Sequence, residues 1–107
     1  MSLDVYLEDD TGRNLYQRNI THNLNKMAGT AGLYECLWRP EEIGITTAHQ
    51  LIAPISKGIA FLVEYRNLCE VDSPLNGWGN WENLYDFCCD YLKACSTHPT
   101  AAVRVWR

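Results

Sequence analysis

The chain has 107 residues, of which 47% are hydrophobic and 21% charged, enough for one globular domain with one core and too few for two. Its formal net charge is −4, from 13 acidic and 9 basic residues, and the basic residues are scattered. This argues against binding to duplex nucleic acid, which requires a stripe of Lys and Arg along the phosphates. The sequence also contains no apolar stretch long enough to span a membrane, so we expect no membrane partner.

The cysteines and the N-terminal segment indicate the compartment. Five cysteines, an odd number that includes the neighbours Cys88 and Cys89, do not make the pattern of a disulfide framework. The first ten residues alternate and are acidic, unlike a secretory signal. We therefore expect a soluble protein of a reducing cytoplasm.

The first predicted elements are a strand and a helix. Leu3, Val5 and Leu7 alternate with polar residues, which is typical of a half-buried strand, and residues 9–13 follow as a turn. From residue 19 the spacing is helical, with Asn19 or Thr21 as N-cap. The apolar positions of this helix are Ile20, Leu24, Met27, Ala28 and Ala31, and Gly32 is its expected end. Residues 33–38 fit a helix or an extended chain equally and stay unassigned.

Two longer helices follow. The first has Thr46 or Thr47 as N-cap, and Pro54 predicts a kink in it because proline cannot donate a backbone hydrogen bond. Its apolar face consists of Leu51, Ile52, Ile55, Ile59, Leu62 and Val63. After a loop at residues 72–77, Asn80 caps the second helix. The apolar face of the second helix consists of Leu84, Phe87, Cys88, Tyr91, Leu92 and Cys95. Pro99 ends it before a terminal strand at residues 101–106.

These elements predict a small α+β domain over residues 1–107. The two terminal strands pair side by side, and about three helices cover the face that carries Leu3, Val5, Leu7, Val103 and Val105. On the other face, Asp4 and Glu8 are expected to approach Arg104. Because a two-stranded sheet is marginal by itself, the helices supply most of the stability.

Three short segments combine amides, a histidine or an arginine with large aromatic side chains. In residues 19–26, Asn19, His22, Asn23 and Lys26 form a polar stripe of the predicted helix, which is either a solvated face or a set of ligand donors and acceptors.

In residues 38–42, Arg39 either binds a phosphate or carboxylate in bidentate fashion, or pairs with Glu41 or Glu42 while stacked on Trp38. In residues 76–81, two glycines expose Trp78 beside Asn76 for recognition, unless Trp78 or Trp81 fills the core beneath the loop.

Signatures of catalysis and of cofactor binding are lacking. Phosphate-loop, dinucleotide and nucleophile-elbow patterns do not occur, and His49 and His98 lack the spacing of a zinc site, so we predict no metal or cofactor. Cys88 and Cys95 are expected to pack as small apolar residues. A Cys36 nucleophile with His22 as its base stays open, because such partners need only be close in space.

Four segments carry a resemblance to known proteins: Asn19-Ile20-Thr21-His22-Asn23, Leu37-Trp38-Arg39-Pro40-Glu41-Glu42, Gly44-Ile45-Thr46-Thr47-Ala48 and Asn76-Gly77-Trp78-Gly79. Together they resemble a family of small phage- and prophage-encoded proteins of uncharacterised function, over Leu3 to Arg107. The resemblance implies a viral accessory role in the host cytoplasm, such as interference with bacterial defence, and it assigns no site residues.

Our leading hypothesis is a non-enzymatic binding protein that engages a small anionic, nucleotide-like ligand or a host protein. Its expected ligand-binding residues are His22, Asn23, Trp38, Arg39, Asn76 and Trp78. One alternative is a small hydrolase or transferase in which His22 acts with Glu41, Glu42 or Cys36. Another is a homo-oligomeric interaction module, a homodimer with Trp78 in its interface. The leading hypothesis requires the three segments to converge in space.

Overall fold

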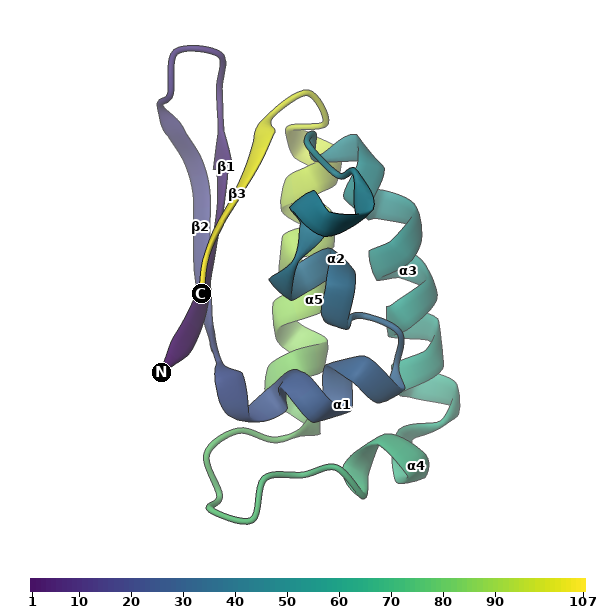
Figure 1. The fold of residues 1–107 in the computed structure, drawn as a ribbon. Coiled ribbons are helices and arrows are strands. Elements are labelled where there is room, and N and C mark those ends of the chain that lie inside the picture. Colours follow the sequence, from purple (N-terminus) through teal and green to yellow (C-terminus); the bar gives the residue numbers. More distant parts are fainter.

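A three-stranded antiparallel sheet forms one layer of the fold and five α-helices form the other (Figure 1). The structure is a computed structural model that describes residues 1–107. The strands are β1 (Ser2–Glu8), β2 (Asn14–Thr21) and β3 (Ala102–Trp106), in the order β2-β1-β3. The predicted α+β class with paired terminal strands is confirmed. None of the helices has the length and apolar character needed to span a bilayer.

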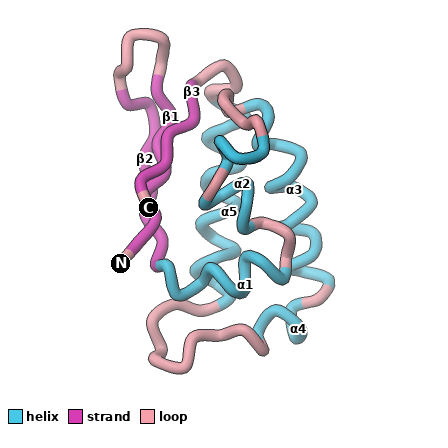
Figure 2. The backbone as a smooth tube through the Cα atoms, in the orientation of Figure 1, coloured by secondary structure: helices cyan, strands magenta, loops and turns pink.

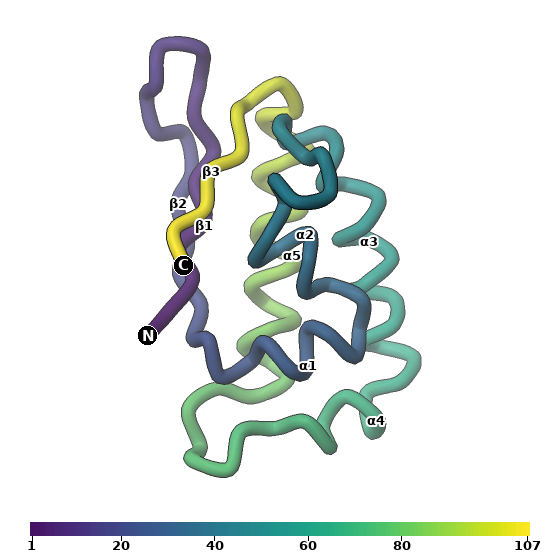
Figure 3. The backbone as a smooth tube through the Cα atoms, in the orientation of Figure 1, coloured from purple at the N-terminus to yellow at the C-terminus, as the bar shows by residue number.

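The central strand β1 turns its apolar residues toward the helices. Leu3, Val5 and Leu7 are completely buried, as the alternation predicted. β3 lies antiparallel beside β1, so that the purple and yellow ends of the chain run together in Figure 3. On the opposite face Arg104 Nε lies 3.5 Å from Glu8 Oε1, as expected, whereas Asp4 accepts a hydrogen bond from Asn19 Nδ2 at 2.8 Å.

The sequence did not predict β2. Only Ile20 among its residues is both apolar and fully buried, so the strand lacks a clear apolar alternation. Tyr16 and Arg18 face the helices through their polar ends, which contact Asp90 at 2.7 and 2.9 Å. The predicted helix start at residue 19 is therefore wrong.

The first helical segment begins after β2. The hydroxyl of Thr21 accepts a hydrogen bond from Asn23 N at 3.3 Å and caps the 3₁₀ helix η1 (His22–Leu24), which leads into α1 (Asn25–Thr30). Gly32 follows with a φ of +73°, the left-handed conformation expected at a helix end. Because Asn19 lies on a strand, the predicted helical stripe of polar residues does not exist.

The remaining helices are α2 (Tyr34–Trp38), the 3₁₀ helix η2 (Pro40–Ile43), α3 (His49–Glu64), α4 (Arg66–Glu70) and α5 (Trp81–Thr97). The predicted threonine cap of α3 is wrong, because Ala48 is at the N-cap position and no side chain caps the helix. Gln50 Oε1 accepts hydrogen bonds from the backbone N–H groups of Thr46 and Thr47 just before it. α4 was not predicted. Asn80 caps α5 in a reciprocal pair with Asn83, in which both hydrogen bonds measure 2.9 Å.

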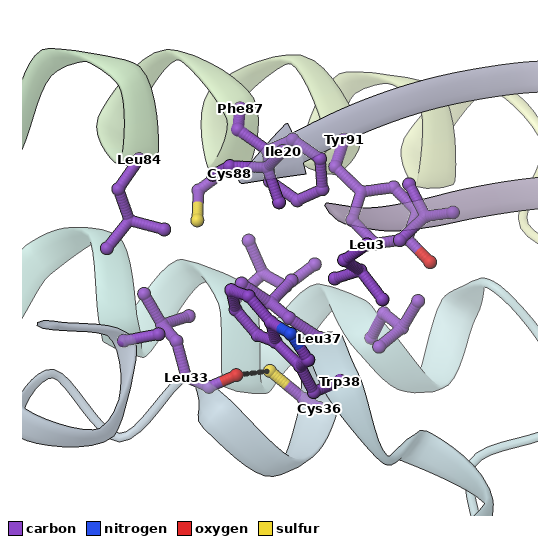
Figure 4. Packing of buried hydrophobic residues seen from close by; sticks show 14 of the residues in the cluster. Leu3, Ile20, Leu33, Cys36, Leu37, Trp38, Leu84, Phe87, Cys88 and Tyr91 are labelled. Atoms are coloured by element: carbon purple, nitrogen blue, oxygen red, sulfur yellow. Dashed lines mark hydrogen bonds between the residues drawn. The ribbon is translucent and has the colours of Figure 1, made fainter. Parts of the chain in front are cut away.

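The core fills the space between the sheet and the helices. Trp38, Phe87 and Tyr91 are its largest fully buried side chains and come from α2 and α5 (Figure 4). α3 approaches α2 closely at Gly58, where a Cβ atom would lie 2.2 Å from Leu33 Cδ2. All five cysteines are free, and Cys88 and Cys95 are buried as predicted. Val63, predicted to be on the apolar face of α3, is exposed instead.

Candidate functional site

The loop between α4 and α5 closes one end of the molecule. It runs beneath the helices and returns to the end of β2, where Gly79 contacts Thr21 and Leu24 (Figure 2). A Cβ atom on Gly79 would lie 2.8 Å from Thr21 Cγ2, so only glycine allows this approach. The segments 19–23 and 76–79, distant in sequence, are thereby brought together.

An open groove lies where these segments meet. Its main hollow has a volume of about 740 Å³ and is lined by Met1, Ser2, Asn19, Thr21, His22, Asn23, Asn76 and Trp78. A hollow of about 230 Å³ continues it toward α5 past Arg18 and Asn83, and another of about 480 Å³ continues it past Asn25 and Leu75. We call the whole the Trp78 groove, because Trp78 lines both the main hollow and the one beside α5.

The loop holds the Trp78 indole out of the core. Its side chain is 70% exposed, and its backbone N–H donates to Asn76 Oδ1 at 3.0 Å. Gly77 and Gly79 on either side have φ values of +74° and +102°, which other residues rarely adopt. The predicted exposure of Trp78 is confirmed. Trp81 takes the buried place and donates from Nε1 to the carbonyl of Leu62 at 3.0 Å.

His22 connects the groove to the core. Its Nδ1 accepts a hydrogen bond from Trp38 Nε1 at 3.0 Å, so in the neutral ring the hydrogen is on Nε2. Nε2 is shielded from solvent and has no hydrogen-bond partner. The contact fixes the ring at the wall of the groove and leaves it one unused donor.

Trp38 and Arg39 lie outside the groove, so only four of the six expected ligand-binding residues converge. Trp38 is buried against Tyr34, with the ring centroids 5.7 Å apart and nearly parallel. Its face is therefore not open to a ligand. Arg39 donates to Glu42 Oε2 at 2.9 Å and to the Tyr34 hydroxyl at 3.1 Å. The structural pairing of Arg39 with Glu42 is thus present, but Tyr34 rather than Arg39 stacks on Trp38.

The side chains that line the main hollow are uncharged, and they combine the apolar Met1 and Trp78 with small polar residues. No Asp, Glu, Lys or Arg side chain lines the main hollow. Arg18 borders the smaller hollow near α5, where it is held by Asp90 at 2.9 Å. The Tyr16 hydroxyl and Arg18 together lower the pKa of the Asp90 carboxyl, so this ion pair persists at neutral pH. The arrangement suits a neutral, hydrogen-bonding ligand better than an anion.

The groups that the catalytic alternative assigns beside His22 are engaged in other contacts. Burial raises the pKa of the Cys36 thiol to about 12, so it is protonated at neutral pH, and it donates to the Leu33 carbonyl. Glu41 pairs with Arg107 and Glu42 with Arg39. No group of three or more His, Cys, Asp or Glu side chains is placed to hold a metal ion.

Comparison with known proteins adds no further constraint. No protein-family model matches the chain, and neither a curated protein nor a solved structure matches it. The resemblance to phage-encoded proteins stays a prediction. The groove also includes Ser2 and Thr21. They were not predicted as ligand contacts, because their place in the groove depends on the pairing of β1 with β2.

Proposed function

We propose that the protein is a non-enzymatic binding protein whose ligand lies in the Trp78 groove. The exposed indole carries this proposal. Aromatic side chains are enriched at surfaces that recognise partners, and here the indole borders a groove where two glycines and the Asn76 hydrogen bond hold its loop in place. A preformed site of this kind loses little conformational entropy when it binds.

The ligand that fits this groove is a planar, uncharged group with hydrogen-bonding edges, such as a nucleobase. The indole offers a stacking face, and Asn23 and Asn76 offer both donors and acceptors. A phosphate clamp of the kind expected for Arg39 is not available, because Arg39 lies outside the groove. We therefore propose that a nucleoside-like group is recognised by its base rather than by its phosphate.

The biological setting that we propose is that of a phage accessory protein acting on a component of its bacterial host. It is supported by the resemblance of residues 19–23, 37–42, 44–48 and 76–79 to phage-encoded proteins. A binding protein that sequesters a small host molecule, or that occupies a host protein, would act in this way without chemistry of its own.

Binding of nucleosides tests the proposal directly. The purified protein is titrated with the four ribonucleosides and, separately, with their 5′-monophosphates, and complexes are detected by native mass spectrometry and amide chemical-shift changes. Trp78→Ala should weaken nucleoside binding by about 5- to 150-fold, the equivalent of the roughly 1–3 kcal/mol that stacking on an aromatic residue contributes.

Trp106→Ala is the matched control. Trp106 is equally exposed, at 73%, but does not line the groove, so this substitution should leave binding unchanged. Equal effects of the two substitutions, or no binding of any nucleoside, would contradict the proposal. Monophosphates that bind far more tightly than nucleosides would show that the phosphate is what is recognised, contrary to the neutral character of the groove.

A further inference from the structure

One long edge of the sheet has no partner. β2 (Asn14–Thr21) pairs with β1 alone, and the strand order β2-β1-β3 leaves its other side without a partner strand. The opposite edge is partly covered. There Thr47 forms a β-bridge with Ala102, and Val103 N donates to the carbonyl of Thr46 at 2.9 Å. The β2 edge is thus the long uncovered one.

β2 also lacks the features that usually protect an edge strand from pairing. It contains neither proline nor lysine, and its one charged residue, Arg18, is turned toward α5, where Asp90 neutralises it. The only irregularity in the pairing, between Leu7 and Glu8, lies at the hairpin end of the strand. An edge of this length without protection favours a partner strand.

The backbone groups on the free side can be identified. In an antiparallel pair, alternate residues exchange hydrogen bonds with the neighbouring strand. His22 N donates to the carbonyl of Met1, next to the pair formed by Ser2 and Thr21. The even-numbered residues of β2 therefore bond to β1, and Gln17 and Asn19 direct their N–H and C=O groups to the free side.

We propose that this edge pairs with the β2 edge of a second copy of the chain, antiparallel about a two-fold axis. Two three-stranded sheets would then join into one of six strands. Two identical edges suit each other, because each unpaired N–H meets an unpaired C=O. The midpoint of β2 (Asn14–Thr21) lies between Gln17 and Arg18, so registers centred on these two residues overlap the strands most fully. The register centred on Arg18 would set two like charges directly opposite each other, so we propose the one that places Gln17 opposite Gln17.

The two ends of the edge favour a second copy as the occupant. Trp78 lies beside Thr21 at one end, and Leu15, an exposed apolar residue, lies at the other. Antiparallel pairing brings Trp78 of each copy toward the Leu15 end of the other. The symmetry therefore makes the same apolar contact twice, which an unrelated peptide would not do.

Sedimentation equilibrium over a series of protein concentrations tests the dimer. The wild-type mass should rise toward twice the chain mass. Gln17→Lys and Gln17→Glu should each stay monomeric because like charges meet at the axis, and an equal mixture of the two should recover the dimer mass. Gln17 is exposed and does not line the Trp78 groove, so neither substitution should unfold the protein.

Asn67→Lys is the matched control, because Asn67 is an exposed amide on α4, outside the proposed interface, and should leave dimerisation intact. A wild-type protein that is monomeric at every concentration overturns the proposal. So does a dimer that persists in both Gln17 variants, which would form through another surface, or a mixture of the two that stays monomeric.

Discussion

Replacing Tyr91 by Phe should stabilise the protein. Tyr91 is fully buried between Phe87 and Tyr16, and its hydroxyl has no hydrogen-bond partner. A buried hydroxyl without a partner costs roughly 1–3 kcal/mol of desolvation. Removing the oxygen breaks no hydrogen bond and leaves only a small void, which offsets part of the gain. We therefore expect the free energy of unfolding to rise by about 1 kcal/mol and Tm to rise by roughly 4–8 °C.

Tyr16→Phe also removes a tyrosine hydroxyl, but here the hydroxyl makes a hydrogen bond. The Tyr16 ring is stacked on Tyr91 at 5.8 Å, but its hydroxyl donates to Asp90 Oδ2 at 2.7 Å. Losing this half-buried, charge-assisted hydrogen bond should lower the free energy of unfolding by about 1 kcal/mol. Urea denaturation followed by circular dichroism measures both variants. If Tyr91→Phe destabilises the protein as much as Tyr16→Phe does, the Tyr91 hydroxyl is satisfied in solution and the reasoning fails.

Two further predictions concern the packing of α3 and the buried acids. Gly58→Ala should lower the free energy of unfolding by about 1–3 kcal/mol, because the new Cβ would overlap Leu33. At Gly29 a Cβ would meet nothing within 4 Å. Gly29→Ala should therefore be neutral or stabilise α1 by up to about 1 kcal/mol. Urea midpoints of the two variants decide this, and equal losses would contradict it. The free energy of unfolding should also fall as the pH rises above about 8.5. Burial raises the pKa of several acidic side chains in the folded state, so above this pH the unfolded chain loses protons that the folded chain keeps, and unfolding is favoured. These acids are Cys36, Cys88, Cys95 and Tyr91. Urea midpoints that do not change between pH 8 and pH 10.5 would contradict this expectation.

The elements that could be predicted are those whose periodicity is unbroken. β1 alternates cleanly, and α5 repeats apolar residues at spacings of three and four behind an asparagine cap. β2 was not predicted because it lacks an alternation of polar and aliphatic residues. It is an edge strand, and Tyr16 and Arg18, rather than aliphatic side chains, occupy its face toward the helices. Ile20, at the end of β2, is four residues before Leu24 in the following helical turn. This spacing is that of a helix, and it led to the incorrect prediction of a helix from residue 19.

The polar and aromatic character of the separate segments of the site was predictable from the sequence, but their convergence in space was not. Glycines around Trp78 indicated an exposed indole, and the amides near His22 indicated a polar surface. Their convergence depends on the β1–β2 hairpin and on the path of the loop before α5, which local sequence does not determine. Trp38 was expected at the surface, but the turn after α1 directs α2 into the core. The Trp38 indole is therefore buried and donates a hydrogen bond to His22.

The position of β1 at the centre of the sheet has a consequence for how the chain folds. The β1–β2 hairpin closes across a short turn and can form early, but Asp4 pairs with Trp106, almost the whole chain away. Contacts between such distant segments slow folding, because the entropy of closing the intervening loop is lost before the contact stabilises anything. We expect β3 to dock last, after the helices have condensed on the hairpin. Until it does, one side of β1 stays open, and the nascent domain is most prone to aggregation in that interval.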